Sequence, residues 1–334
     1  MSLGKKYLSF SVIFLLLFLH SNSYCQGRDA IDGPIRSRNQ YSPFMLFMDL
    51  YPDGANTAPK GHVKCSFNME YSNIYQIQAW AGWHAEADME ALRTSLDVVY
   101  GLWDNLDVGV EIPFVYLLGG FLDHTTGEVH DILSVSNQLR DLRRENELSY
   151  FIRHDGRYWF NVDSPTSGLG DIVLHGKYRF LREGLKIPSA SIRLGVKFPT
   201  GDEERGMGSG EFDLGYGLVL EKHWGKWGFY LDLNHLLLGD PDGVFDIDIH
   251  NAFSGTFALE YWLWENFSLL GQINGHTSPY STGIEALDDD ALQILFGVKY
   301  RFLKTAIWQI SFTEDIEGLT VSDFTIHTGI VFSL

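Results

Sequence analysis

The sequence predicts an all-β protein: a transmembrane antiparallel up-and-down β-barrel of about twelve strands, with both termini in the periplasm. Three observations lead to this prediction. The chain begins with an export signal, it repeats segments in which apolar and polar residues alternate, and its connectors are alternately short and long. Its 334 residues suffice for one large β domain.

Residues 1–24 are typical of a secretory signal peptide, because two lysines precede an apolar run and small or polar residues follow it. The run extends from Leu8 to Leu19, well short of the roughly 20 residues that a membrane helix needs. We expect cleavage between Ser23 and Gln26. No later stretch of the sequence is long and apolar enough for a membrane helix, so any segments that span a membrane must be strands.

Alternation with a period of two recurs along the rest of the chain. Between residues 106 and 116 every second residue is aliphatic or aromatic, and Asp107 and Glu111 lie among the residues between them. Such a strand presents one face to lipid and one to the lumen. The pattern predicts an even number of strands, at 62–73, 90–100, 106–117, 171–181, 189–199, 211–221, 227–237, 249–263, 267–275, 291–302, 306–313 and 322–334.

The connectors orient the barrel. Outer-membrane barrels have short periplasmic turns and longer outside loops. The short links are predicted at 102–105, 182–188, 222–226, 264–266 and 303–305. The long links are predicted at 73–89, 118–170, 200–210, 238–248, 275–290 and 314–321. This alternation predicts periplasmic termini, a barrel over residues 62–334 and a long extracellular loop at 118–170.

Aromatic residues gather beside the short links, as in the girdle that barrels place at the level of the lipid headgroups. They are Tyr100, Trp103, Tyr178, Phe180, Trp224, Trp227, Tyr261, Trp262, Trp264, Tyr300 and Phe302.

Two resemblances to known proteins add to this interpretation. Gly329, Phe332 and Leu334 resemble the C-terminal signal by which the barrel assembly machinery recognises outer-membrane barrels, although that signal usually ends in an aromatic residue. Motifs spread over most of the mature chain resemble those of an uncharacterised Gram-negative family, described as a predicted outer-membrane domain of unknown function. They are GPIRSRNQ at 33–40, EIPF at 111–114, GGFLD at 119–123, GLGD at 168–171, FPTG at 198–201 and GSG at 208–210. The resemblance implies fold and localisation, and it supplies no catalytic residue.

The predicted lumen face carries eight basic and eight acidic side chains. They are Lys64, Arg93, Lys177, Arg179, Arg193, Lys197, Lys299 and Arg301, with Glu70, Asp97, Asp107, Glu111, Asp213, Glu221, Asp232 and Glu260. The fourth and fifth strands carry basic residues, and the third and sixth carry acidic ones. The charges predict either a field across a narrow aqueous pore or an interior filled by ion pairs between neighbouring strands.

Two segments could obstruct the lumen. Residues 25–61 form an arm before the first strand, which we interpret either as a plug inside the barrel or as a periplasmic arm that ties down its base. The 118–170 loop is expected to fold over or into the barrel mouth, with a helix at 132–142 and a hairpin around Asp155 and Gly156.

No metal, cofactor or catalytic site is expected. The loop residues Asp123, His124, Glu128, His130 and Asp131 lack a diagnostic spacing. The acidic groups Asp240, Asp242, Asp246, Asp248, Asp288, Asp289 and Asp290 do not complete a calcium loop and are interpreted as solvated tips.

The sequence favours a passive channel for a small solute. The chain has 25 basic and 43 acidic residues, an excess of acid that argues against nucleic acid as a partner. The expected partners are outer-membrane lipid, the barrel assembly machinery and the solute. One alternative is a closed barrel with a surface-binding or envelope-structural role, and a third is an interfacial enzyme. The oligomeric state is not indicated.

Overall fold

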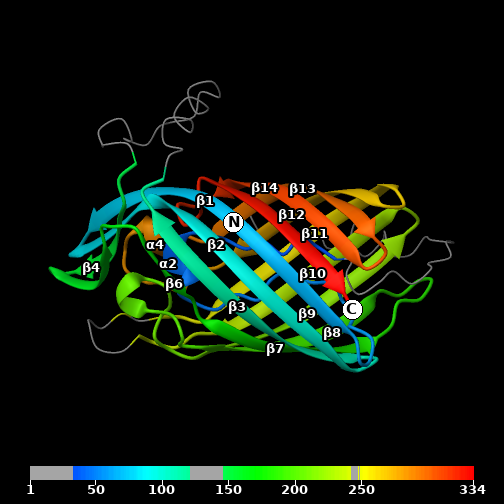
Figure 1. Cartoon of the computed structure of the whole chain (residues 1–334). Helices are drawn as coiled ribbons and strands as arrows, with labels where there is room; N and C mark the ends of the chain where they lie inside the picture. Colours follow the sequence, from blue (N-terminus) through cyan, green and yellow to red (C-terminus); the bar gives the residue numbers. More distant parts are fainter. Residues whose placement is uncertain (1–32, 121–145, 242–246, 248) are drawn as a thin grey trace, which may run out of the picture.

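The computed structural model describes residues 33–120, 146–241, 247 and 249–334. Twelve antiparallel strands follow one another around a barrel, and the last pairs with the first to close it (Figure 1). They are β1 (Val63–Trp80), β2 (Trp83–Trp103), β3 (Leu106–Leu118), β7 (Ile172–Leu181), β8 (Ser189–Phe198), β9 (Asp213–Trp224), β10 (Trp227–Leu237), β11 (Ala252–Trp264), β12 (Phe267–His276), β13 (Ala291–Leu303), β14 (Ala306–Glu317) and β15 (Phe324–Ser333).

The predicted strands are confirmed, with one clear error in the first hairpin. The long link expected at 73–89 does not exist, because β1 and β2 continue to a two-residue turn at Ala81 and Gly82. Residues 85–91 are all buried, whichever face of the strand they lie on. Both faces are covered there, so the alternation on which the prediction depended disappears.

Along the barrel wall, side chains alternate between an exposed apolar face and a buried polar face. The register pairs Phe67 with Leu96, and these side chains are 47% and 43% exposed. The adjacent pair, Ser66 and Asp97, is fully buried. The outer surface is therefore apolar, and the polar residues face the lumen.

The two ends of the barrel differ. The turn end carries the short links 104–105, 182–188, 225–226, 265–266 and 304–305 together with the C-terminus. The loop end carries the longer connectors. Most of the predicted girdle residues are exposed near the turn end, namely Tyr100, Trp103, Tyr178, Phe180, Trp227, Trp264, Tyr300 and Phe302. The prediction is wrong for Trp262, which is buried in the interior. The guanidinium of Arg301 lies 5.7 Å from the centre of its ring.

A hairpin covers part of the loop end. β4 (Ser149–His154) and β5 (Arg157–Val162) form the hairpin predicted around Asp155 and Gly156, and both turn residues have positive φ. β4 pairs with the extended part of β2, and β6 (Thr166–Leu169) pairs with β3. The predicted helix at 132–142 and the candidate metal ligands at 123–131 lie outside the described residues, as does the signal peptide.

The arm before β1 lies inside the barrel. Residues 33–40 run from Gly33 towards the loop end, where α2 (Ser42–Met45) lies near β4 and α4 (Glu285–Asp288) (Figure 1). Residues 46–61 then return to the turn end, where the amide of Gly61 donates to the carbonyl of Gly101. No helix in the described ranges is long and apolar enough to span a bilayer.

Glycines of the inner wall leave room for the arm. A Cβ atom at Gly195 would lie 2.4 Å from the methyl carbon of Met48, and one at Gly297 would lie 2.3 Å from the Cδ1 atom of Ile35. Any larger residue at these positions would push against the arm. At these two positions, therefore, side chains of the arm pack directly on the strand backbone.

We expect the substitution Gly195→Val to displace the returning leg of the arm, because the added methyl groups would occupy the space of Met48. The measurement is the rate at which trypsin cleaves the folded protein within the arm, which should rise. Gly271→Val is the matched control, because nothing lies within 4 Å of a Cβ at Gly271. Equal cleavage rates in both variants would contradict this packing.

Candidate functional site

The candidate site is the lumen, which the arm crosses twice. The outgoing leg is held by side chains that bond to its backbone. Gln272 accepts from the amide of Ile35 and donates to the carbonyl of the same residue, both at 3.1 Å. Further along, the side-chain amide of Asn274 donates to the carbonyl of Ser37 at 3.2 Å. This leg has no strand partner, so the barrel wall supplies its hydrogen bonds.

Carboxylates of the wall accept hydrogen bonds from amides of the returning leg. Asp213 accepts from Met48 at 2.8 Å, Glu221 from Ala55 at 2.7 Å and Asp107 from Ala58 at 2.9 Å. Asp232 accepts from the amide of Asp53 at 3.2 Å. These bonds are charge-assisted, which makes them stronger than neutral ones.

Cations of the same wall donate to carbonyls of the arm. Lys197 donates to Leu46 at 2.8 Å, Arg193 to Tyr51 at 2.5 Å and Lys177 to Gly54 at 2.8 Å. Lys299 donates to the carbonyl of Gly33. The charges of both signs on the lumen face therefore bind the irregular backbone of the arm.

The carboxylate of Asp53 forms the shortest ion pair between the arm and the wall among the described residues. It lies 2.6 Å from the ammonium of Lys177 and 3.4 Å from that of Lys64. Both lysines are buried, and Asp53 is the only carboxylate within 4 Å of either ammonium among the described residues. Removing Asp53 would thus leave two buried cations without an ion-pair partner.

A second ionic cluster lies where Tyr51 of the arm meets β1, β2 and β3. Arg93 lies 2.7 Å from Glu111 and 3.9 Å from Glu70, and the hydroxyl of Tyr51 donates to Glu70 at 3.1 Å. Ser37 of the outgoing leg also donates to Glu70, at 2.8 Å. The cluster joins both legs of the arm to the wall.

Nearby, Arg36 of the arm lies 3.2 Å from Asp97, which also contacts the ring of His175 at 2.7 Å. The sequence patterns place all three arm residues in the segment before the first strand but do not identify Tyr51 or Asp53 as members of the site. Both follow an apolar run in a segment without regular alternation, where no pattern fixes which residues face the wall.

The structure buries all the proposed lumen residues except Arg179 and Arg301, which lie near the turn end. Arg179 donates to Asn56 at 2.8 Å, and Arg301 lies over Trp262. The expected pairing between adjacent strands occurs for Arg93 with Glu111.

The pair of Lys197 with Asp213 on the next strand, at 2.9 Å, agrees with the same expectation, and Lys197 also lies 2.9 Å from Asp171. Other ion pairs differ from it. Arg193 reaches Asp232 two strands away at 3.5 Å, and Lys299 reaches Glu260 two strands away at 3.2 Å. Lys177 pairs with the arm rather than with β3 or β9. The arm thus takes over part of the pairing that neighbouring strands were expected to provide.

The proposed assembly residues lie where the barrel closes. Gly329 and Phe332 are in β15, opposite Asn68 and Cys65 of β1, and Leu334 exchanges backbone hydrogen bonds with Val63. Their role in recognition by the assembly machinery stays a prediction.

The acidic loops fold around their own carboxylates. Asp288 accepts from the amides of Thr282 and Gly283, and Asp240 accepts from the amide of Ile249. Asp242, Asp246 and Asp248 lie outside the described residues. Within the described ranges, no group of three or more histidine, cysteine, aspartate or glutamate residues could hold a metal ion.

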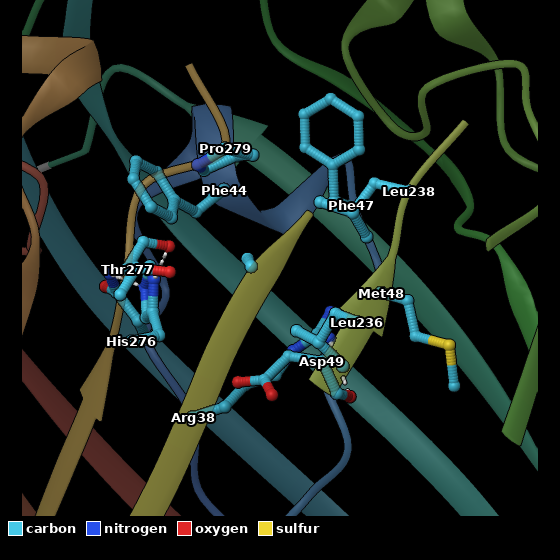
Figure 2. Close-up of a pocket in the computed structure, with 12 residues that line it drawn as sticks. Arg38, Phe44, Phe47, Met48, Asp49, Leu236, Leu238, His276, Thr277 and Pro279 are labelled. Atoms are coloured by element: carbon cyan, nitrogen blue, oxygen red, sulfur yellow. Dashed lines mark hydrogen bonds between the residues drawn. The ribbon is translucent and has the colours of Figure 1, made fainter. Parts of the chain in front are cut away.

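Cavities remain between the arm and the wall in the half of the lumen nearer the loop end. Three of them are small, with volumes of about 20, 20 and 10 Å³, and all include Arg38 in their lining. Figure 2 shows the first, with Phe44, His276 and Thr277 to one side and Phe47, Leu236 and Leu238 to the other.

At the turn end, Glu183 fastens the 182–188 link to the end of β9. It accepts hydrogen bonds from Lys222 at 2.7 Å and from the amide and ring of His223 at 2.8 and 3.0 Å. Burial raises the pKa of Glu183, but these hydrogen bonds outweigh burial, so the pKa lies below its ordinary value.

A carboxyl whose pKa is lowered by folding stabilises the protein above its unfolded pKa and loses that effect as the pH falls through its folded pKa. We therefore expect Glu183→Gln to lower the melting temperature at pH 5.5, and the difference from wild type to shrink between about pH 4.5 and pH 3. Thermal unfolding followed by circular dichroism measures this. A difference that stays constant down to pH 3 would contradict the assignment.

We expect Asp53→Asn to weaken docking of the arm by about 3 kcal/mol, because Lys64 and Lys177 would lose their carboxylate. Trypsin should then cleave the arm faster in the folded protein. Asp155→Asn, at the exposed tip of the β4–β5 hairpin, should leave the rate unchanged. Slow cleavage in both variants would show that the ion pairs do not hold the arm.

The fold is similar to that of the COG4313 outer membrane channel from Pseudomonas putida F1. The two structures superpose with a TM-score of 0.58 and 14% sequence identity, over 86% of this chain and 100% of that one. The likeness shows the barrel fold. The NanC porin is less similar, with 10% identity and a TM-score of 0.43 over 82% of this chain and 99% of that one. The P. putida toluene transporter TodX has 11% identity and a TM-score of 0.37 over 83% of this chain and 89% of that one.

No curated protein matches the chain. A family described as a protein of unknown function, DUF3187, matches residues 26–334. The match covers nearly the whole chain and confirms the family resemblance seen in its motifs. The protein therefore belongs to the DUF3187 family, a family of proteins of unknown function.

Proposed function

We propose that the protein is a passive outer-membrane channel for small solutes, in which the arm at residues 33–61 is a movable plug. One observation carries the proposal. The arm crosses the lumen in both directions without joining the sheet, and side chains of the wall hold it by hydrogen bonds and ion pairs. The arm can therefore leave the lumen without breaking any strand pairing of the barrel.

The lumen would remain a suitable pathway once the arm had moved. Its wall carries equal numbers of basic and acidic side chains, so an opened lumen is charge-balanced and wettable. Water and neighbouring wall charges would replace the contacts to the arm. A neutral, hydrated passage of this kind suits small polar or singly charged solutes.

The proposal includes the placement of the barrel in the membrane. The apolar outer surface faces lipid, and the exposed aromatic residues of the turn end lie at the inner headgroup level. The turn end and both termini face the periplasm, and the loop end faces outward. The similarity to an outer membrane channel of the same fold supports this placement.

A closed barrel with an envelope-structural or surface-binding role is the second candidate, because apolar packing covers part of the loop end. Phe44 and Phe47 of the arm belong to one apolar cluster with Tyr150 and Trp159 of the β4–β5 hairpin. In that case the arm would fill the lumen permanently. The two candidates differ in whether the arm ever leaves its place.

Conductance of the purified protein in planar lipid bilayers separates the candidates. We expect the wild type to show brief openings, and Asp53→Asn to raise the fraction of time open at least tenfold, because ~3 kcal/mol of docking energy is lost. Asp155→Asn should behave as the wild type. Heat-dependent migration on a gel verifies that each barrel is folded. Folded wild type and Asp53→Asn that are both electrically silent would reject the channel in favour of the closed barrel.

A further inference from the structure

The exposed charges at the turn end of the barrel are mainly positive. Among the described residues, the exposed lysines and arginines of this end come from the short links and from the end of the arm. They are Lys60, Arg182, Lys186, Lys226 and Lys304, and we call them the basic rim. Only Asp104 and Glu265 are exposed carboxylates at this end of the described chain. The links that carry the rim surround the end of the barrel where the C-terminus lies (Figure 1).

The cations of the basic rim have no ion-pair partner in the described part of the chain, where no carboxylate oxygen lies within 4 Å of their charged nitrogens. Glu183 follows Arg182 directly but lies 2.7 Å from the ammonium of Lys222 instead. The ammonium of Lys226 donates to the carbonyl of Leu263 at 3.1 Å, which satisfies one donor and leaves the charge uncompensated. An array of unpaired like charges attracts an anionic surface.

The loop end has the opposite sign. Its exposed charges are mostly carboxylates, among them Asp155, Glu204 and Asp240. Arg157 and Arg205 are the exposed arginines of this end in the described ranges, and Arg205 lies 3.1 Å from Asp202. The charge of the molecule is therefore divided between its two ends, although the chain as a whole is strongly acidic.

The 182–188 link combines the rim with apolar side chains. Leu185 and Ile187 are 61% and 47% exposed, on either side of Lys186. The amide of Gly184 donates to the carbonyl of Ile187 at 3.1 Å, and Glu183 fastens the link to β9. Exposed apolar side chains beside cations are typical of segments that enter the headgroup layer of a bilayer.

The other rim residues also adjoin the apolar outer surface. Lys226 precedes the exposed ring of Trp227, and Lys304 follows Phe302 and Leu303, which are exposed as well. The apolar stem of a lysine extends along such a surface and brings its ammonium to the level of the phosphates. A partner that offers apolar chains and negative charge side by side therefore fits the rim better than a soluble polyanion.

We infer that the basic rim binds the phosphate groups of anionic phospholipids. The five cations attract the headgroups, and Leu185, Ile187 and the neighbouring aromatic rings contact the acyl chains. The acidic loop end repels the same lipids. That the turn end meets the periplasmic leaflet rests on the proposed placement of the barrel, whereas the binding itself does not.

Tryptophan fluorescence of the purified protein in lipid vesicles tests the inference. Trp103, Trp227 and Trp264 are exposed at the turn end, so they report quenching by phosphatidylglycerol or phosphatidylcholine with brominated chains. We expect phosphatidylglycerol to associate at least threefold more strongly at about 0.1 M NaCl, and the preference to disappear at about 1 M, where charges are screened within roughly 3 Å. Equal association of both lipids, or a preference that salt leaves unchanged, would overturn the inference.

Matched variants locate the binding. Lys226→Gln with Lys304→Gln should lower the preference about twofold, and adding Arg182→Gln with Lys186→Gln should abolish it. Arg157→Gln with Arg205→Gln removes the same charge as the first pair from the loop end. It should leave the preference unchanged, because charges act over only about 10 Å at this salt concentration.

Heat-dependent migration on a gel verifies that each variant is folded. If the first pair does not fold, Arg182→Gln with Lys186→Gln replaces it, with the same expected loss. An unchanged preference in a folded rim variant, or equal losses in the rim and loop-end variants, would refute the assignment.

Lipid preference and conductance are measured separately, so the two proposals fail separately. A protein that conducts in phosphatidylcholine bilayers and shows no lipid preference retains the channel and loses the lipid site. A protein that selects phosphatidylglycerol through the basic rim and never conducts retains the lipid site and loses the channel.

Discussion

The structure depends on one requirement: an irregular backbone inside a barrel must find hydrogen-bond partners away from bulk water. The arm meets this requirement through the charged side chains of the wall. Asp213, Glu221 and Asp107 accept from its amides, and Lys197 and Lys177 donate to its carbonyls. The wall charges need partners for the same reason, since an unpaired buried charge is strongly destabilising. Arm and wall therefore stabilise each other.

This mutual dependence explains which features the sequence predicts and which it does not. The twelve strands follow from the period of two, because lipid and lumen impose opposite requirements on successive residues. The pattern fails at 85–91, where side chains on both faces of β2 are buried and that contrast is absent. The Asp155 and Gly156 turn was predictable because it depends on local backbone conformation alone.

The composition of the candidate site was predictable from the sequence, but its ion pairs were predictable only in part. The alternation placed Lys177, Lys197 and Asp213 on the inner face, where they are buried. It gave no indication that Lys177 pairs with Asp53, 124 residues earlier in the chain, because nothing local fixes the path of the arm. The small cavities beside Arg38 are a further example, since residues of both legs of the arm line them and no sequence pattern marks that place.

The central claim is that conduction requires the arm to leave the lumen. It is tested most directly by a reversible tether, made by placing cysteines at Ala55 and Ser191, whose hydroxyl donates to the Ala55 carbonyl at 2.5 Å, with the native cysteines replaced. Conductance is recorded from the same protein before and after reduction. The account predicts a silent protein while the disulfide holds the arm and openings once it is reduced. Equal conductance in both states would contradict it.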